Sequence, residues 1–102
     1  MTRFDKIIEQ LDTEWAMDGF FGRVRQGDFD DARAQAVLVL LRGFRLENED
    51  LVPQRLVALL WYMPSFLEWQ TERVEQRGGS RSDYERFTTE VMNALEEALG
   101  TP

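Results

Sequence analysis

The side chains of this chain that are capable of chemistry are mainly carboxylates, because the sequence contains no histidine and no cysteine. Ser-His-Asp and Cys-His arrangements are therefore impossible, and the commonest general acid–base residue is missing. Glu68 and Glu72 lie four residues apart, so one helix face would carry both, and paired carboxylates can bind a metal or share a proton. Di-iron sites in helical bundles also need a Glu-x-x-His motif, which this chain lacks. Nearby Arg73 and Arg77 favour a solvated, ion-paired face.

A second carboxylate group, Asp28, Asp30 and Asp31, lacks the ligand spacing and the glycine of a calcium loop. Helix capping accounts for Asp28 and Asp31. The glycines in residues 19–22 have neither the lysine nor the preceding strand of a phosphate-binding loop. We therefore predict no catalytic residue, no metal, no cofactor and no enzymatic activity.

The formal net charge of −7 argues against nucleic-acid binding, which requires a basic face to neutralise phosphates. Arg23 and Arg25 beside Phe20 and Phe21 suggest a base-stacking platform, but two arginines are too few in an acidic protein. A net charge of magnitude about 2–8 is also ordinary for a small soluble domain. The charge is thus compatible with a basic partner without requiring one.

The length of 102 residues fits one domain, residues 1–102, that can bury a core without disulfides or metals. Zero cysteine suits a reducing compartment. Charged residues interrupt the N-terminal segment, and no apolar run approaches the roughly 20 residues that span a bilayer. We expect a cytoplasmic protein with no membrane contact.

Helical periodicity predicts an all-α fold from the first residues onward. A first helix follows Thr2 as its N-cap, and residues 19–27, with three glycines, allow only a short helical turn. A second helix should run from an Asp28 cap to about Arg45, leaving Leu38 on its polar strip. Its predicted apolar arc consists of Phe29, Ala32, Ala36, Val37, Val39, Leu40 and Phe44.

The third predicted helix is the most apolar, with Asp50 as its cap and Pro53 in its first turn. Pro64 should kink or break it before it continues to about Arg77.

The last helix should begin at a capping box formed by Ser82 and Glu85 and end at Gly100. Its predicted buried stripe consists of Tyr84, Phe87, Val91, Leu95 and Ala98. Together these elements predict a compact four-to-five-helix bundle, broken or kinked at Pro64.

Aromatic residues of the third helix cannot all face the core of so small a bundle. On an ideal helix Tyr62 and Trp69 share one face, whereas Trp61 lies among polar residues with Glu68 and Glu72. Tryptophan and tyrosine are enriched at binding hot spots. Two interpretations are open: these rings form a partner surface, or the bend at Pro64 turns them into the core.

Size, acidity and helical content resemble, at class level, the small acidic all-α immunity proteins with which bacteria neutralise their own toxins. Those proteins bind a toxin domain, often a basic nuclease, through acidic and aromatic residues on exposed helices and loops. The resemblance implies a bacterial protein that blocks a basic toxin by occlusion. Its implied partner-binding residues are Glu47, Glu49, Asp50, Trp61, Tyr62 and Trp69.

Two alternatives remain open. The protein could be a homodimer or larger homo-oligomer with Trp61 and Leu38 in the interface. It could instead be a carboxylate-based metal-dependent or hydrolytic enzyme that uses Glu68 and Glu72.

Overall fold

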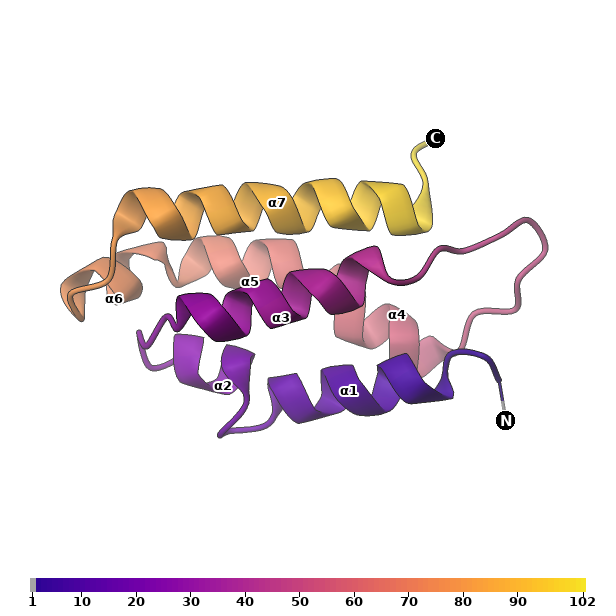
Figure 1. Ribbon diagram of the computed structural model, residues 1–102, viewed down its shortest axis with the longest axis horizontal. Coiled ribbons are helices and arrows are strands. Elements are labelled where there is room, and N and C mark those ends of the chain that lie inside the picture. The colour runs from indigo at the N-terminus through magenta and orange to yellow at the C-terminus, as the bar shows by residue number, and fades with distance from the viewer. Residues whose placement is uncertain (1) are drawn as a thin grey trace.

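The computed structural model describes residues 2–102, in which seven helical segments follow one another without a strand (Figure 1). The segments are α1 (Asp5–Trp15), α2 (Phe20–Val24), α3 (Asp31–Arg42), α4 (Gln54–Trp61), α5 (Met63–Trp69), α6 (Thr71–Gln76) and α7 (Arg81–Leu99). Within the described residues, none of these helices has the length and apolarity needed to cross a membrane.

The helices form a bundle of four arms, which confirms the predicted all-α bundle. Helices α4, α5 and α6 are separated only by Tyr62 and Gln70, so together they make one long, bent arm. In Figure 1, α1 and this arm run in one direction, and α3 and α7 run in the other. Pro64 lies in the first turn of α5, where its missing N–H breaks no helical hydrogen bond.

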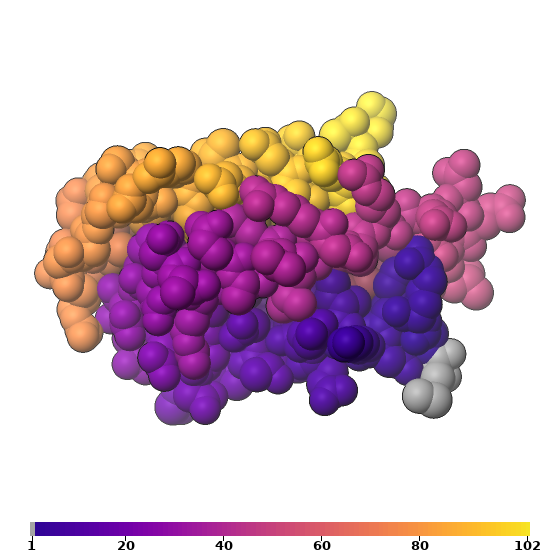
Figure 2. All heavy atoms as spheres, viewed as in Figure 1, coloured from indigo at the N-terminus to yellow at the C-terminus, as the bar shows by residue number. Residues whose placement is uncertain are grey.

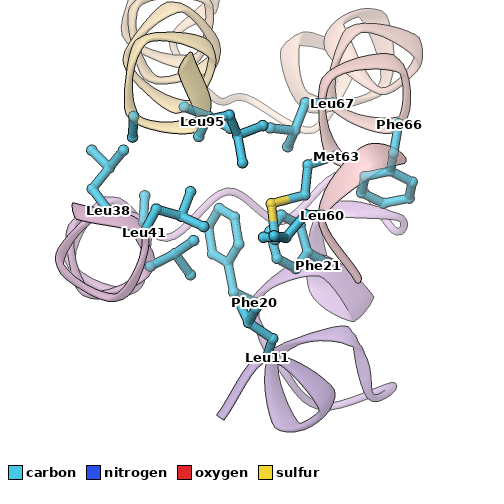
Figure 3. Close-up of a cluster of buried hydrophobic side chains, with 14 of the residues drawn as sticks. Leu11, Phe20, Phe21, Leu38, Leu41, Leu60, Met63, Phe66, Leu67 and Leu95 are labelled. Carbon is cyan, nitrogen blue, oxygen red and sulfur yellow. The ribbon is translucent and has the colours of Figure 1, made fainter. Parts of the chain in front are cut away.

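Helix α2 follows the end of α1 in Figure 1, and it contributes its aromatic side chains to the core. Phe20 and Phe21 are both buried, and in Figure 3 the Phe20 ring lies between Leu41 of α3 and Leu60 of α4. These two rings therefore belong to the core and are not available to stack on a base.

Glycine is required where α2 approaches the end of α1. A Cβ atom on Gly19 would lie 2.2 Å from the carbonyl oxygen of Thr13. One on Gly22 would lie 2.1 Å from the carbonyl oxygen of Ala16. The glycines of this segment thus allow close backbone packing, which positions Phe20 and Phe21.

The predicted buried face of α3 was partly wrong. Leu38 is fully buried, whereas Ala32, Ala36 and Val39, assigned to the apolar arc, are exposed. Helix α3 packs most extensively on α7. Its buried stripe is narrower than the predicted apolar arc. The buried residues of α3 are Ala34, Val37, Leu38 and Leu41.

The predicted caps of α3 and α7 lie at other positions. Asp30 rather than Asp28 caps α3, because its side chain accepts a 3.2 Å hydrogen bond from the N–H of Arg33. Ser80 rather than Ser82 caps α7 through the N–H of Asp83, also at 3.2 Å. Each true cap lies immediately before the first helical residue, where its side chain reaches the N–H groups of the first turn.

The starts of α1 and α4 also differ from the prediction. The residue that precedes α1 is Phe4, and the Thr2 hydroxyl accepts only the N–H of Phe4. Helix α4 begins after Pro53, so Asp50 lies too early in the chain to cap it. In contrast, the buried stripe of α7 and its end at Gly100 are confirmed.

Candidate partner-binding surface

Trp61, Tyr62 and Trp69, which we call the aromatic triad, lie together on the surface. Trp61 ends α4, Tyr62 joins α4 to α5, and Trp69 ends α5. The Tyr62 ring centroid is 5.5 Å from that of Trp61 and 5.8 Å from that of Trp69. The exposed fractions are 65% for Trp61 and 66% for Trp69, and Tyr62 is half-buried. The bend in this arm therefore turns neither tryptophan into the core.

Tyr62 connects the exposed tryptophans to the core. Its ring centroid lies 6.0 Å from those of both Trp15 and Phe66. Trp15 in turn stacks on buried Phe21 at 4.3 Å and donates its Nε1–H to the carbonyl oxygen of Leu59 at 3.0 Å. A ring held in this way loses little conformational entropy when a partner binds it. The Trp15 contact has no signal in the sequence beyond its place on the apolar face of α1.

Two shallow hollows adjoin the triad. One of about 220 Å³ includes Tyr62, Trp15, Arg25 and Arg55 in its lining. The other, of about 240 Å³, brings Trp61 beside residues of α7. Both fall below the roughly 300 Å³ at which small-molecule pockets begin, so they suit single inserted side chains better than a cofactor.

Carboxylates border the triad on the α5–α7 side. Glu68 and Glu72 are exposed, and Glu96 lines the same hollow as Trp61. Among the ion pairs of residues 2–102, none involves these three side chains. On the other side Arg55 pairs with Asp12, and the Arg25 guanidinium lies 5.3 Å from the Phe66 ring centroid. Within the described residues, carboxylates without an ion pair therefore lie on the α5–α7 side of the triad, whereas two arginines without one, Arg25 and Arg73, lie on the side of the Tyr62 hollow.

The other three predicted residues lie elsewhere, in the connection from α3 to α4. Glu47 and Glu49 are exposed on this loop, which projects beyond the helices in Figure 2. Trp61 is the last of the eight residues of α4, at the end away from the loop. At 1.5 Å per residue, this helix is about 12 Å long. The structure therefore gathers the three aromatic residues but not all six.

Asp50 has an internal partner. Its Oδ2 lies 2.6 Å from the Arg3 guanidinium and 2.6 Å from the main-chain nitrogen of Glu47. The hydrogen bond from Arg3, followed by that from the Glu47 N–H, holds the pKa of the Asp50 carboxyl below its usual range. Asp50 thus joins the loop to the start of the chain, which leaves Glu47 and Glu49 as the freer charges.

Comparison of the chain with models of known protein families, with curated proteins and with solved structures finds no match. A functional proposal for this chain therefore depends on its own surface.

The Glu68–Glu72 pair is divided between two short helices, α5 and α6, that are interrupted at Gln70. Within residues 2–102 no three carboxylates converge in an arrangement that would hold a metal ion. No contact of either carboxylate specifically favours the alternative of a carboxylate-based enzyme.

Proposed function

We propose that this chain is a non-enzymatic protein-binding module, specifically an immunity protein that neutralises a basic bacterial toxin by occlusion. The aromatic triad carries the proposal, because it exposes two tryptophans that Tyr62 supports from the core. Exposed large rings on a rigid base are the residues that supply most binding energy in protein interfaces.

The charge distribution supports a basic partner. Six arginines already form ion pairs within the chain: Arg3, Arg42, Arg45, Arg55, Arg81 and Arg86. Carboxylates without such a pair remain beside the triad and on the loop that carries Glu47 and Glu49. An unbalanced negative field of this kind accelerates association with a positively charged surface.

One partner is large enough to touch both regions. A standard interface buries about 800 Å² on each side, which spans more than the ~12 Å length of α4. In this arrangement the triad would form the centre of the interface. Glu47 and Glu49 would meet basic residues at its rim, where charges set the association rate more than the affinity.

The first experiment identifies the partner and tests the triad in one sequence. The protein is used to capture partners from cells that express it natively, and any basic protein retained is purified for titration calorimetry. We expect Trp61→Ala and Trp69→Ala to weaken binding by about tenfold or more, the usual effect at a hot spot. Met17→Ala removes an exposed apolar side chain outside both the triad and the loop of Glu47 and Glu49, and it serves as the matched control.

The captured protein is then expressed alone in a naive bacterial host. Growth arrest that is relieved by wild-type protein but not by Trp61→Ala/Trp69→Ala would support neutralisation by occlusion. A harmless captured protein, or tryptophan variants that bind as tightly as wild type, would contradict the proposal.

A second copy of the chain is the alternative partner. Trp61, Met92 and Leu99 are exposed apolar side chains around one hollow, an arrangement that a homodimer would cover. Leu38 cannot contribute, because it is fully buried. Sedimentation equilibrium at high protein concentration decides this point: a dimer lost on Trp61→Ala would favour self-association, and a monomer would exclude it.

A further inference from the structure

A separate groove runs between α1 and the end of α3, on the face seen in Figure 2. Its volume is about 580 Å³. Small-molecule sites occupy roughly 300–1,000 Å³, so this groove is large enough for a ligand, unlike the hollows beside the aromatic triad. Its accessible apolar lining comes from the α3 side, from exposed Val39 and half-buried Leu40 and Phe44. On the α1 side Phe4 and Ile7 are buried, and the Arg3 guanidinium lies 4.3 Å from the centroid of the Phe4 ring.

The groove is lined by cations in a protein whose formal net charge is −7. Arg3, Lys6, Arg42 and Arg45 all line it, against the single carboxylate of Glu47. It thus gathers four of the chain's twelve basic residues. No other feature described above places apolar surface beside so many donors.

Two of these cations, Arg42 and Arg45, have carboxylate partners outside the groove lining. Arg42 lies 3.5 Å from Glu90, and Arg45 lies 3.4 Å from Glu97. Both arginine side chains are more than half exposed, so these are weak surface pairs that an entering anion can replace or share. Each guanidinium has five N–H donors, more than one carboxylate uses.

The other two cations, Arg3 and Lys6, differ in whether they already have partners within the chain. Arg3 is more firmly held, by Asp50 at 2.6 Å and by the carbonyl oxygen of Arg45 at 2.8 Å. Lys6 has no ion pair with any of residues 2–102. The donors available to a ligand are therefore those of Lys6, Arg42 and Arg45.

We propose that this groove binds a small amphiphilic anion of the fatty-acid type. Its hydrocarbon chain would lie on Val39, Leu40 and Phe44, and its head group would meet Lys6, Arg42 and Arg45. Guanidinium groups bind carboxylate and phosphate oxygens in the same bidentate geometry, so a fatty acid and an alkyl phosphate share the required chemistry. The proposal does not depend on the toxin-binding function of the aromatic triad.

The test is a titration of isotope-labelled protein, followed by amide chemical shifts, with decanoate and with decyl phosphate below their micelle-forming concentrations. Decyltrimethylammonium, which has the same chain and the opposite charge, is the matched ligand control. We expect saturable shifts at Ile7, Leu40 and Phe44 with the anions and none with the cation. The stronger of the two anions identifies the head group.

Charge reversal in the groove supplies the second arm. Lys6→Glu/Arg45→Glu should weaken decanoate and decyl phosphate binding by about tenfold, whereas Arg81→Glu/Arg86→Glu makes the same charge change at the start of α7 and should leave it unaltered. Circular dichroism checks that both variants fold. Equal binding of the cationic detergent, equal weakening by both variants, or binding only to phosphatidylglycerol vesicles would overturn the proposal.

Discussion

Tyr84 shows how one buried polar group makes stability depend on pH. Its hydroxyl donates to the carbonyl oxygen of Leu67 at 2.6 Å, inside the core. Burial raises the pKa of Tyr84 above its ordinary value. An unfolded tyrosine ionises near pH 10, so the folded state keeps a proton that the unfolded chain loses. The stabilisation is fully present below about pH 10 and declines as the pH rises towards the folded pKa.

Removing the Tyr84 hydroxyl tests its hydrogen bond and its ionisation separately. Tyr84→Phe should lower the free energy of unfolding by about 1–2 kcal/mol at pH 7, because it removes a buried hydrogen bond. The same variant should lose less stability than wild type above pH 10. Urea denaturation at pH 7 and at intervals from about pH 9 to 11 measures both quantities. An identical alkaline loss in the two proteins would show that Tyr84 is not its source.

At the scale of elements, the junction of α1 and α2 depends on the absence of side chains. Gly22→Ala places a methyl group against the backbone of Ala16 and Met17, which cannot move as a side chain can. We expect the free energy of unfolding to fall by about 3 kcal/mol or more. Gly43→Ala is the milder comparison, because its Cβ would lie 3.2 Å from the Val39 carbonyl oxygen, a tight contact that a shift of a few tenths of an ångström relieves. Thermal denaturation compares the two, and equal midpoints would refute the packing argument.

The orientation of α3 can be tested with two neighbouring residues. Leu38 is fully buried against the rest of the bundle, whereas Val39 is 69% exposed. Leu38→Ala should therefore lower the free energy of unfolding by about 2–5 kcal/mol. Val39→Ala should change it by no more than about 0.5 kcal/mol. Chemical denaturation gives both values, and the reverse order would mean that α3 is rotated about its axis.

At the scale of the whole molecule, charge and aromatic surface should affect different rate constants. The excess of carboxylates should make association with a basic partner slow several-fold as salt rises from about 50 to 200 mM, since the Debye length shortens. Trp61→Ala should instead act mainly by speeding dissociation, because it removes contact area. Stopped-flow association and surface plasmon resonance with the captured partner measure the two constants. A salt-independent association rate would remove the electrostatic part of the proposal.

The sequence alone determined which segments are helical and where several of them end. The stripe of Tyr84, Phe87 and Val91 and the stop at Gly100 follow from local periodicity and backbone preference, which act within a few residues. The exposed position of Trp61 was one of two open interpretations, since ideal helix geometry already placed it among polar residues.

Only the tertiary structure decided the features that join distant parts of the chain. Leu38 is fully buried on a helix that packs most extensively on α7, and the Asp50 carboxylate is ion-paired because Arg3 lies beside it in space. The interruption at Tyr62 lets its ring reach Trp15, Trp61 and Trp69 together. Periodicity specifies a helix and its apolar and polar faces. Which neighbour covers which face depends on packing among all the arms of the bundle.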